Sequence, residues 1–280
     1  MKTLTPIHIT DNYLINPTNP ITVNLIGCGG TGSQMLTNLA RINQAMLALN
    51  HPGLMVFAFD DDTVSEANLG RQLFAESELG LSKSVVLINR INRFFGTNWK
   101  ARTGRYDAEY AQRQPNEGKA NLFITCVDNA VSRFEIATIL EDFRDYRSYE
   151  RNRPLYWMDL GNSKDTGQVI LSTIGNHKQP DSKKYVPVGN LPFVTDTFKE
   201  LMETADASDN TPSCSLAEAL TKQDLFINST LANMGSSLLW QLFKEGILFN
   251  CGFFMSLRDF RTQPIKIPSA NNREIERGRI

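Results

Sequence analysis

Short apolar runs alternate with amphipathic stretches over the first 160 residues of the chain. The runs ITVNLI (21–26) and LMVFAF (54–59) are typical of buried strands, and between them apolar residues recur at the spacing of a helix. The same reasoning predicts strands at 99–106, 122–127 and 155–160 and helices at 82–95 and 130–145. Alternation of this kind indicates a doubly wound α/β fold around a mainly parallel sheet.

The pattern changes beyond residue 161. A strand at 167–174 is followed by a segment rich in Asp, Ser, Thr and Pro, for which we predict a surface loop. A helix at 226–249 and strands at 253–257 and 264–267 predict antiparallel additions to the sheet. We therefore divide the chain into an N-terminal extension, a core, a polar loop carrying Cys214, and a C-terminal helix and strands completing the same domain (1–20, 21–175, 176–215 and 216–280).

Charge and cysteine usage exclude several classes of protein. The 29 Lys and Arg residues balance 30 Asp and Glu residues, so we expect no nucleic-acid or membrane partner. The N-terminus lacks the features of a signal peptide, and no run approaches the ~20 apolar residues of a membrane span. The four cysteines form no Cys-x-x-Cys pair, which argues against disulfides and zinc. We expect a soluble cytoplasmic protein.

A glycine turn follows the first predicted core strand. Gly27, Gly29 and Gly32 lie between strand and helix, where small residues let backbone N–H groups approach phosphate oxygens. Asp60 ends the next strand, where a carboxylate accepts hydrogen bonds from ribose hydroxyls in Rossmann-like dinucleotide-binding sheets. ATP and NAD fit these features equally, and a tight structural turn is the simpler alternative.

The loop after Asp60 distinguishes the two nucleotides. It contains Asp62 and is followed by two cations and two amides, Asn68, Arg71, Gln72 and Lys83. Hydride transfer does not need such a cluster, whereas adenylyl transfer does, because charge develops on the α-phosphate and on pyrophosphate. Asp128 follows the strand at 122–127 and is a candidate magnesium ligand, or else the N-cap of the next helix.

The ordered motifs GCGGTG, FDDDTVSEANLGRQ, GLSK and CVDNAVSR resemble those of the ThiF/MoeB-like adenylating enzymes, relatives of the ubiquitin-activating enzymes. The resemblance covers about residues 21–175. The whole chain also resembles the ThiF-related family of the PRTRC cassettes found on bacterial plasmids and mobile elements. A resemblance in several ordered motifs is far more specific than the glycine turn alone.

The resemblance implies an adenylation core at 21–175 that uses ATP and Mg²⁺. It implies that Arg71 and Lys83 are catalytic, that Asp128 binds magnesium, and that the glycines, Asp60, Asp62, Asn68 and Gln72 bind the nucleotide. The substrate would be the C-terminal carboxylate of a small ubiquitin-like or sulfur-carrier-like protein, with a conjugating-type protein as a further partner. A homodimer is also implied, although residues 1–20 contain no arginine to share with a neighbour.

Cys214 precedes a predicted helix in a polar loop, and the resemblance implies a catalytic role for it as the thiol that attacks the adenylate. The alternative is a small buried apolar residue, which we expect for Cys28, Cys126 and Cys251. Two other functions stay open. An NAD-dependent oxidoreductase would need a catalytic group that none of the three histidines convincingly supplies, and a nucleotide-binding adaptor of a plasmid-associated system would bind ATP without catalysis.

Overall fold

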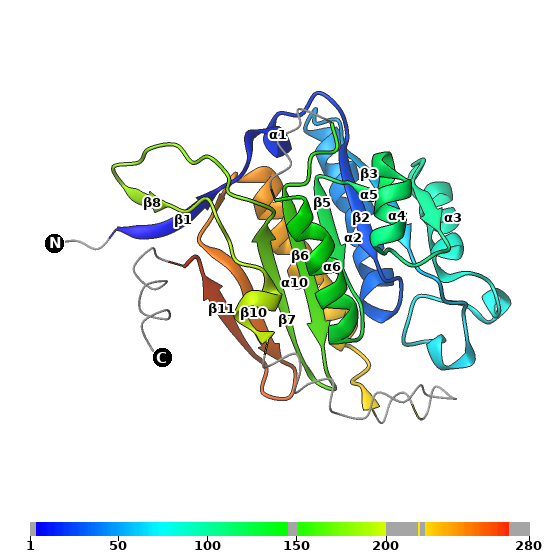
Figure 1. The fold of residues 1–280 in the computed structure, drawn as a ribbon. Coiled ribbons are helices and arrows are strands. Elements are labelled where there is room, and N and C mark those ends of the chain that lie inside the picture. Colours follow the sequence, from blue (N-terminus) through cyan, green and yellow to red (C-terminus); the bar gives the residue numbers. More distant parts are fainter. Residues whose placement is uncertain (1–3, 145–150, 200–217, 219–221, 269–280) are drawn as a thin grey trace.

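An eight-stranded sheet forms the centre of the molecule (Figure 1). The computed structural model describes residues 4–144, 151–199, 218 and 222–268. The sheet order is β11-β10-β7-β6-β5-β2-β3-β4, in which the neighbours from β6 to β4 are parallel and those from β11 to β6 are antiparallel. Its strands are β2 (Ile21–Ile26), β3 (Leu54–Phe59), β4 (Lys100–Arg102), β5 (Leu122–Thr125), β6 (Tyr156–Asn162), β7 (Thr166–Thr173), β10 (Asn250–Ser256) and β11 (Arg261–Lys266). The predicted α/β fold with antiparallel C-terminal strands is confirmed.

Helices cover both faces of this sheet, each over its own apolar cluster. The cluster on one face includes side chains of α2 (Gly30–Ala48), α3 (Lys83–Phe95) and α10 (Ile227–Lys244). The other face carries α4 (Ala108–Arg113), α5 (Pro115–Gly118), α6 (Ala130–Asp142) and α7 (Val194–Thr197). Three further elements are short helical turns: α1 (Asn12–Ile15), η1 (Glu66–Asn68) and η2 (Glu76–Glu78). No helix in the described part of the chain has the length and apolar character of a membrane span.

A second, three-stranded sheet joins segments that the sequence pattern left as extension, loop and helix. Its strand β1 (Thr5–Ile9) pairs in parallel with β8 (Tyr185–Pro187) and antiparallel with β9 (Ile247–Leu248). The helix predicted to reach residue 249 ends at Lys244, because Gly246 has a positive φ of 67° that stops the helix before β9. The predicted polar loop likewise contains β8 and α7.

A buried cluster around Tyr156 connects this small sheet to the large one. Hydrogen bonds join the Tyr156 hydroxyl to His8 Nε2 (2.8 Å) and His177 Nδ1 (3.3 Å), and the backbone N–H of Asp11 donates to the same hydroxyl (2.9 Å). Arg153 pairs with the Asp11 carboxylate at 3.0 Å. Burial lowers the pKa of His8, and burial together with the nearby His8 lowers the pKa of His177.

The cluster predicts that the protein loses stability in mild acid. The unfolded chain takes up protons at histidine below about pH 6.5, whereas the folded chain resists protonation of His177, so stability rises with pH in this range. Lowering the pH from 7.5 to 5.5 should cost about 1 kcal/mol through His177. Urea unfolding at the two pH values measures this loss. The His177→Asn variant should show a smaller loss, and an equal loss in variant and wild type would contradict the assignment.

Candidate functional site

The glycine turn between β2 and α2 is built by close backbone contacts. Gly27 has a φ of 91°, and its N–H donates to the carbonyl of Phe59 at 2.9 Å. A Cβ on Gly27 would lie 2.7 Å from the carbonyl oxygen of Cys126, and one on Gly32 would overlap the carbonyl oxygen of Gly27. A Cβ on Gly29 would meet nothing closer than a Gln72 oxygen at 4.0 Å. Two glycines therefore permit the turn, and the third leaves room above the N-terminus of α2.

The turn should not tolerate a methyl group at Gly32. The Gly32→Ala variant is expected to lower the free energy of unfolding by about 1 to 3 kcal/mol, because the backbone of Gly27 must move to relieve the overlap. Gly104→Ala is the matched control, since an added Cβ there meets no atom within 4 Å. Urea unfolding of both variants decides the point, and equal stability of the two would contradict this account of the turn.

Asp60 follows the last residue of β3 and holds the glycine turn through hydrogen bonds to its carboxylate. Its Oδ2 accepts a hydrogen bond from Cys28 N–H at 2.5 Å, and its Oδ1 accepts one from Asp62 N–H at 2.9 Å. Burial raises the pKa of Asp60, while the hydrogen bond from Cys28 acts in the opposite direction. Each carboxylate oxygen retains a free lone pair. Asp60 can thus hold the turn in shape and still accept a further hydrogen bond.

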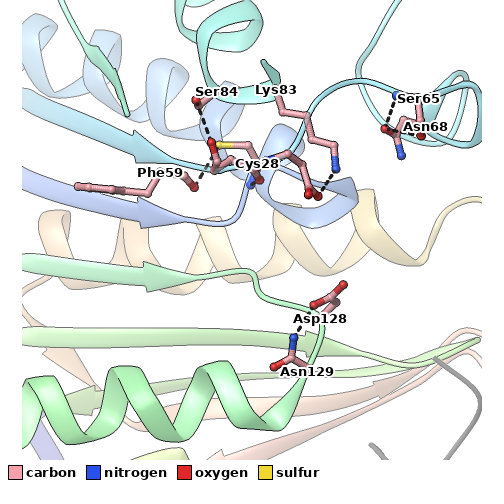
Figure 2. A network of polar contacts seen from close by, with 10 residues as sticks. Cys28, Phe59, Ser65, Asn68, Lys83, Ser84, Asp128 and Asn129 are labelled. Atoms are coloured by element: carbon pink, nitrogen blue, oxygen red, sulfur yellow. Dashed lines mark hydrogen bonds and ion pairs between the residues drawn. The ribbon is translucent and has the colours of Figure 1, made fainter. Parts of the chain in front are cut away.

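Lys83 reaches the same corner from the first residue of α3 (Figure 2). Its Nζ lies 2.7 Å from Asp62 Oδ2, and its backbone N–H donates to the carbonyl of Asp62 at 3.1 Å. The Lys83 side chain is 9% exposed whereas that of Asp62 is 68% exposed, so the ammonium group sits beneath a solvent-facing carboxylate. In the described part of the chain, the only grouping of three potential metal-ligating side chains is Asp60, Asp61 and Asp62, next to this cation.

Asn68 and Gln72 lie in the loop that follows β3. The buried Asn68 side chain caps η1, because its Oδ1 accepts hydrogen bonds from Ser65 N–H (2.9 Å) and Ser65 Oγ–H (3.1 Å). Gln72 donates its backbone N–H to the carbonyl of Asn68 at 2.9 Å. Its buried Oε1 has no partner and faces Gly29. If the Gln72 side-chain amide rotates so that its oxygen and nitrogen exchange places, its N–H donors face an anion bound at the glycine turn. Asn68 thus shapes the loop, whereas Gln72 faces the turn directly.

Arg71 contacts the C-terminal part of the chain. Its Nη1 donates to Gln223 Oε1, which also accepts a hydrogen bond from Asn228 Nδ2 at 3.0 Å. Asn228 Oδ1 in turn accepts from Thr31 Oγ–H at 2.9 Å. Arg71 Nε is buried without a partner, and burial lowers the pKa of the guanidinium. Sequence reasoning missed Gln223 and Asn228, which no local motif marks, and it did not single out Thr31 although this residue lies within the motif GCGGTG.

Asp128 is exposed at the same edge of the sheet. The N-cap of α6 is Asn129, whose side chain accepts a hydrogen bond from Ser132 N–H at 2.8 Å. Asn129 Nδ2 donates to Asp128 Oδ1 at 3.0 Å. The alternative that Asp128 caps this helix is therefore wrong, and its carboxylate stays open to solvent. One such carboxylate fits magnesium, which takes its other ligands from phosphate and water.

A buried ion pair supports the segment that carries Asp128. Arg133 Nε lies 3.1 Å from Asp159 Oδ1, and Arg133 Nη2 donates to the carbonyl of Val127 at 2.6 Å. Thr125 Oγ–H donates to the same Asp159 oxygen at 2.6 Å. Both ionic side chains are less than 10% exposed. Sequence reasoning did not single out this pair, although Arg133 ends the motif CVDNAVSR.

Two of the cysteines, Cys28 and Cys251, are confirmed as buried residues, and Cys126 is half-buried against the main apolar cluster. Burial raises the pKa of Cys28, Cys126 and Cys251. A thiol with a raised pKa is a poor nucleophile. Cys214 lies outside the described residues, so its predicted role stays a prediction.

The structure thus places Asp60, Asp62, Gln72 and Lys83 around the glycine turn, with Asp128 at the same edge of the sheet. The model of the ThiF family matches residues 18–244, which include the glycine turn, Arg71, Lys83 and Asp128. The chain belongs to the ThiF family. No curated protein matches it.

Solved structures agree with the fold of this ThiF-family chain. PaaA has a TM-score of 0.56 at 16% identity, and the match covers 88% of this chain and 64% of PaaA. MccB from E. coli has a TM-score of 0.56 at 13% identity, with 92% and 64% covered. MccB with ATP has a TM-score of 0.53 at 13% identity, with 90% and 64% covered. The chain therefore spans about 64% of the length of these neighbours, and the likeness establishes the fold.

Proposed function

We propose that this chain binds ATP at the glycine turn and transfers its adenylyl group to the C-terminal carboxylate of a small protein or peptide. The observation that carries the proposal is that two cations, Arg71 and Lys83, are held by contacts that lead back to the glycine turn. Lys83 reaches it beside Asp62 and Asp60, and Arg71 through contacts that lead to Thr31 in the first turn of α2. Hydride transfer does not need such a pair of cations, whereas adenylyl transfer does, because charge develops on the α-phosphate and on pyrophosphate.

The arrangement suits a reaction that needs charge and position rather than proton transfer. A carboxylate oxygen attacks the α-phosphorus, and the bond from that phosphorus to the bridging oxygen of pyrophosphate breaks. The nucleophile is already ionised, so no general base is required. Lys83 and Arg71 would stabilise the charge that develops on the phosphates, Gln72 would donate to a phosphate oxygen, and Asp60 would accept from the ribose.

The residues also fit a bound magnesium ion. Asp128 would hold the ion together with phosphate oxygens, and the ion would neutralise phosphate charge. Arg133 would keep this carboxylate in place by holding the carbonyl of Val127, the residue before it. The exposed position of Asp128 agrees with a ligand that acts only when nucleotide is present.

The partner is proposed from two lines of support. One E. coli MccB structure contains ATP and another contains MccA, and the ordered motifs resemble those of enzymes that act on small ubiquitin-like or sulfur-carrier-like proteins. We propose such a protein as the substrate and a conjugating-type protein as a further partner. We also propose that the chain is active as a cytoplasmic homodimer and belongs to a PRTRC cassette.

Calorimetric titration with magnesium-ATP and, separately, with NAD tests the nucleotide assignment. ATP should bind to the wild-type protein and more weakly to Arg71→Ala, because that variant lacks one of the two cations. NAD should not bind. Binding of NAD without ATP would overturn the proposal and favour an oxidoreductase.

Pyrophosphate exchange separates an enzyme from a nucleotide-binding adaptor. With a candidate small ubiquitin-like or sulfur-carrier-like protein as substrate, label from pyrophosphate should enter ATP, since adenylate formation is reversible. Binding of ATP without exchange, across the candidate partners, would favour the adaptor.

Cys214 is proposed as the thiol that accepts the partner from the adenylate. The Cys214→Ala variant should exchange pyrophosphate at the wild-type rate and lose any adduct that a reducing agent cleaves, because adenylation precedes attack by the thiol. Cys251→Ala is the control, since that thiol is buried and its pKa is raised to about 11. Gel analysis with and without reductant shows the adduct, and its persistence in Cys214→Ala would place the nucleophile elsewhere.

A further inference from the structure

The start of α10 packs directly on the start of α2. Asn228 is 3% exposed, and its side chain lies 2.6 Å from the place where a Cβ on Gly30 would be. Its Oδ1 accepts a hydrogen bond from Thr31 Oγ–H at 2.9 Å. The two helices then run beside each other, as Figure 1 shows. The first turn of α10 is therefore part of the wall around the proposed phosphate site.

Gln223 lies between Asn228 and Arg71 in a chain of hydrogen bonds. Its Oε1 accepts hydrogen bonds from Arg71 Nη1 and from Asn228 Nδ2, so one amide oxygen faces two donors. The backbone after it is held by Asp224 N–H, which donates to the carbonyl of Lys164 at 2.7 Å, and by Phe226 N–H, which donates to Asp224 Oδ1 at 2.8 Å. The oxygen is thus presented to Arg71 by a defined local structure.

Arg71 is incompletely satisfied by this contact. Its Nε is buried without a partner, and its Nη1 donates a hydrogen bond to the neutral side-chain amide of Gln223. A phosphate offers several charged oxygens to the same guanidinium, and it adds an attraction between opposite charges that the neutral amide cannot supply. A triphosphate at the turn would therefore compete successfully with Gln223 for Arg71.

We propose that Gln223 is an intramolecular stand-in for a phosphate oxygen, which holds Arg71 until bound ATP takes it over. The inference rests on the proposed function and adds a residue that sets nucleotide affinity. In this proposal the amide and the phosphate compete for the same donor, Arg71 Nη1, so linkage works in both directions. Loss of the Gln223 amide must strengthen ATP binding, and ATP must loosen residues 222–226. A residue that merely positions Arg71 for ATP would have the opposite effect on affinity.

Calorimetric titration of three variants with magnesium-ATP tests the sign of this effect. Gln223→Ala should lower the Kd about three- to tenfold, since it removes one competing hydrogen bond. Gln223→Glu should raise the Kd more than tenfold, because a carboxylate holds Arg71 more tightly and repels phosphate. Gln44→Ala is the control, because Gln44 lies near the C-terminal end of α2, is exposed, and donates its side-chain N–H to the backbone carbonyl of Phe95 at the end of α3. An unchanged or higher Kd in Gln223→Ala would overturn the inference.

Hydrogen exchange on the wild-type protein tests the same linkage without a variant. Amides in residues 222–226 should exchange faster with magnesium-ATP than without it, whereas those in 39–48 of α2 should not change. Equal or slower exchange at 222–226 would overturn the inference even if the variants fail to fold. Failure of the wild-type protein to bind ATP would overturn the proposed function as well, whereas ATP binding with these signs absent would overturn this inference alone.

Discussion

Replacing Arg133 by alanine is expected to lower the free energy of unfolding by about 3 to 5 kcal/mol. The substitution leaves the Asp159 carboxylate 1% exposed and without its cation, and it removes the donor that holds the carbonyl of Val127. A buried charge without a partner is among the costliest defects that a single substitution can cause. Urea unfolding followed by circular dichroism measures the loss.

Two further variants show whether the buried charge is the cause. Arg113→Ala removes an arginine whose exposed partner Glu109 lies 3.3 Å away, and it should change stability little. The double variant Arg133→Met with Asp159→Leu removes both charges and should be more stable than Arg133→Ala. If the double variant were less stable than the single one, the cost would come from lost packing instead.

Replacing Lys83 by methionine is expected to reduce pyrophosphate exchange about 100- to 1,000-fold, mainly through kcat. Methionine keeps a long apolar stem in this buried place but cannot stabilise the charge that develops on the phosphates. The thermal unfolding temperature should change little, since Asp62 is 68% exposed and is solvated without its partner. Exchange is measured with the protein partner at saturating ATP.

The control for Lys83 is a lysine that is far from the turn. Lys244 ends α10 and is exposed, so Lys244→Met should exchange pyrophosphate at the wild-type rate. Exchange close to wild type in Lys83→Met would remove this residue from the catalytic site. A similar loss in both lysine variants would point to a general effect of charge.

Local pattern alone was sufficient for the elements of the parallel core. The strands predicted at 21–26 and 54–59 match β2 and β3 to the residue, because continuous apolar runs bounded by turn residues suit strands buried on both faces. The turn formed by Gly27, Gly29 and Gly32 could also be predicted from local pattern, since a tight turn between a strand and a helix needs small residues. The antiparallel strands near the C-terminus followed from the same reasoning.

Local pattern failed for the small sheet. β9 has two residues and β8 has three, and neither is long enough to show a period of alternation. Their pairing with β1 joins residues about 180 and 240 positions apart, as Thr5 with Tyr185 and His8 with Leu248. A strand of this kind is stabilised by its pairing with another strand rather than by its own residues. It therefore cannot be predicted from the local sequence pattern.

The sequence by itself determined the type of fold, the position of the glycine turn and the residue types that can bind a nucleotide, because those depend on neighbours close along the chain. Only the tertiary structure decided that Gln223 faces Arg71, that Arg133 is paired with Asp159, and that Asp62 covers Lys83. The physical reason is that burial and hydrogen bonding of a polar side chain depend on which distant segments enclose it, and no local pattern records that choice.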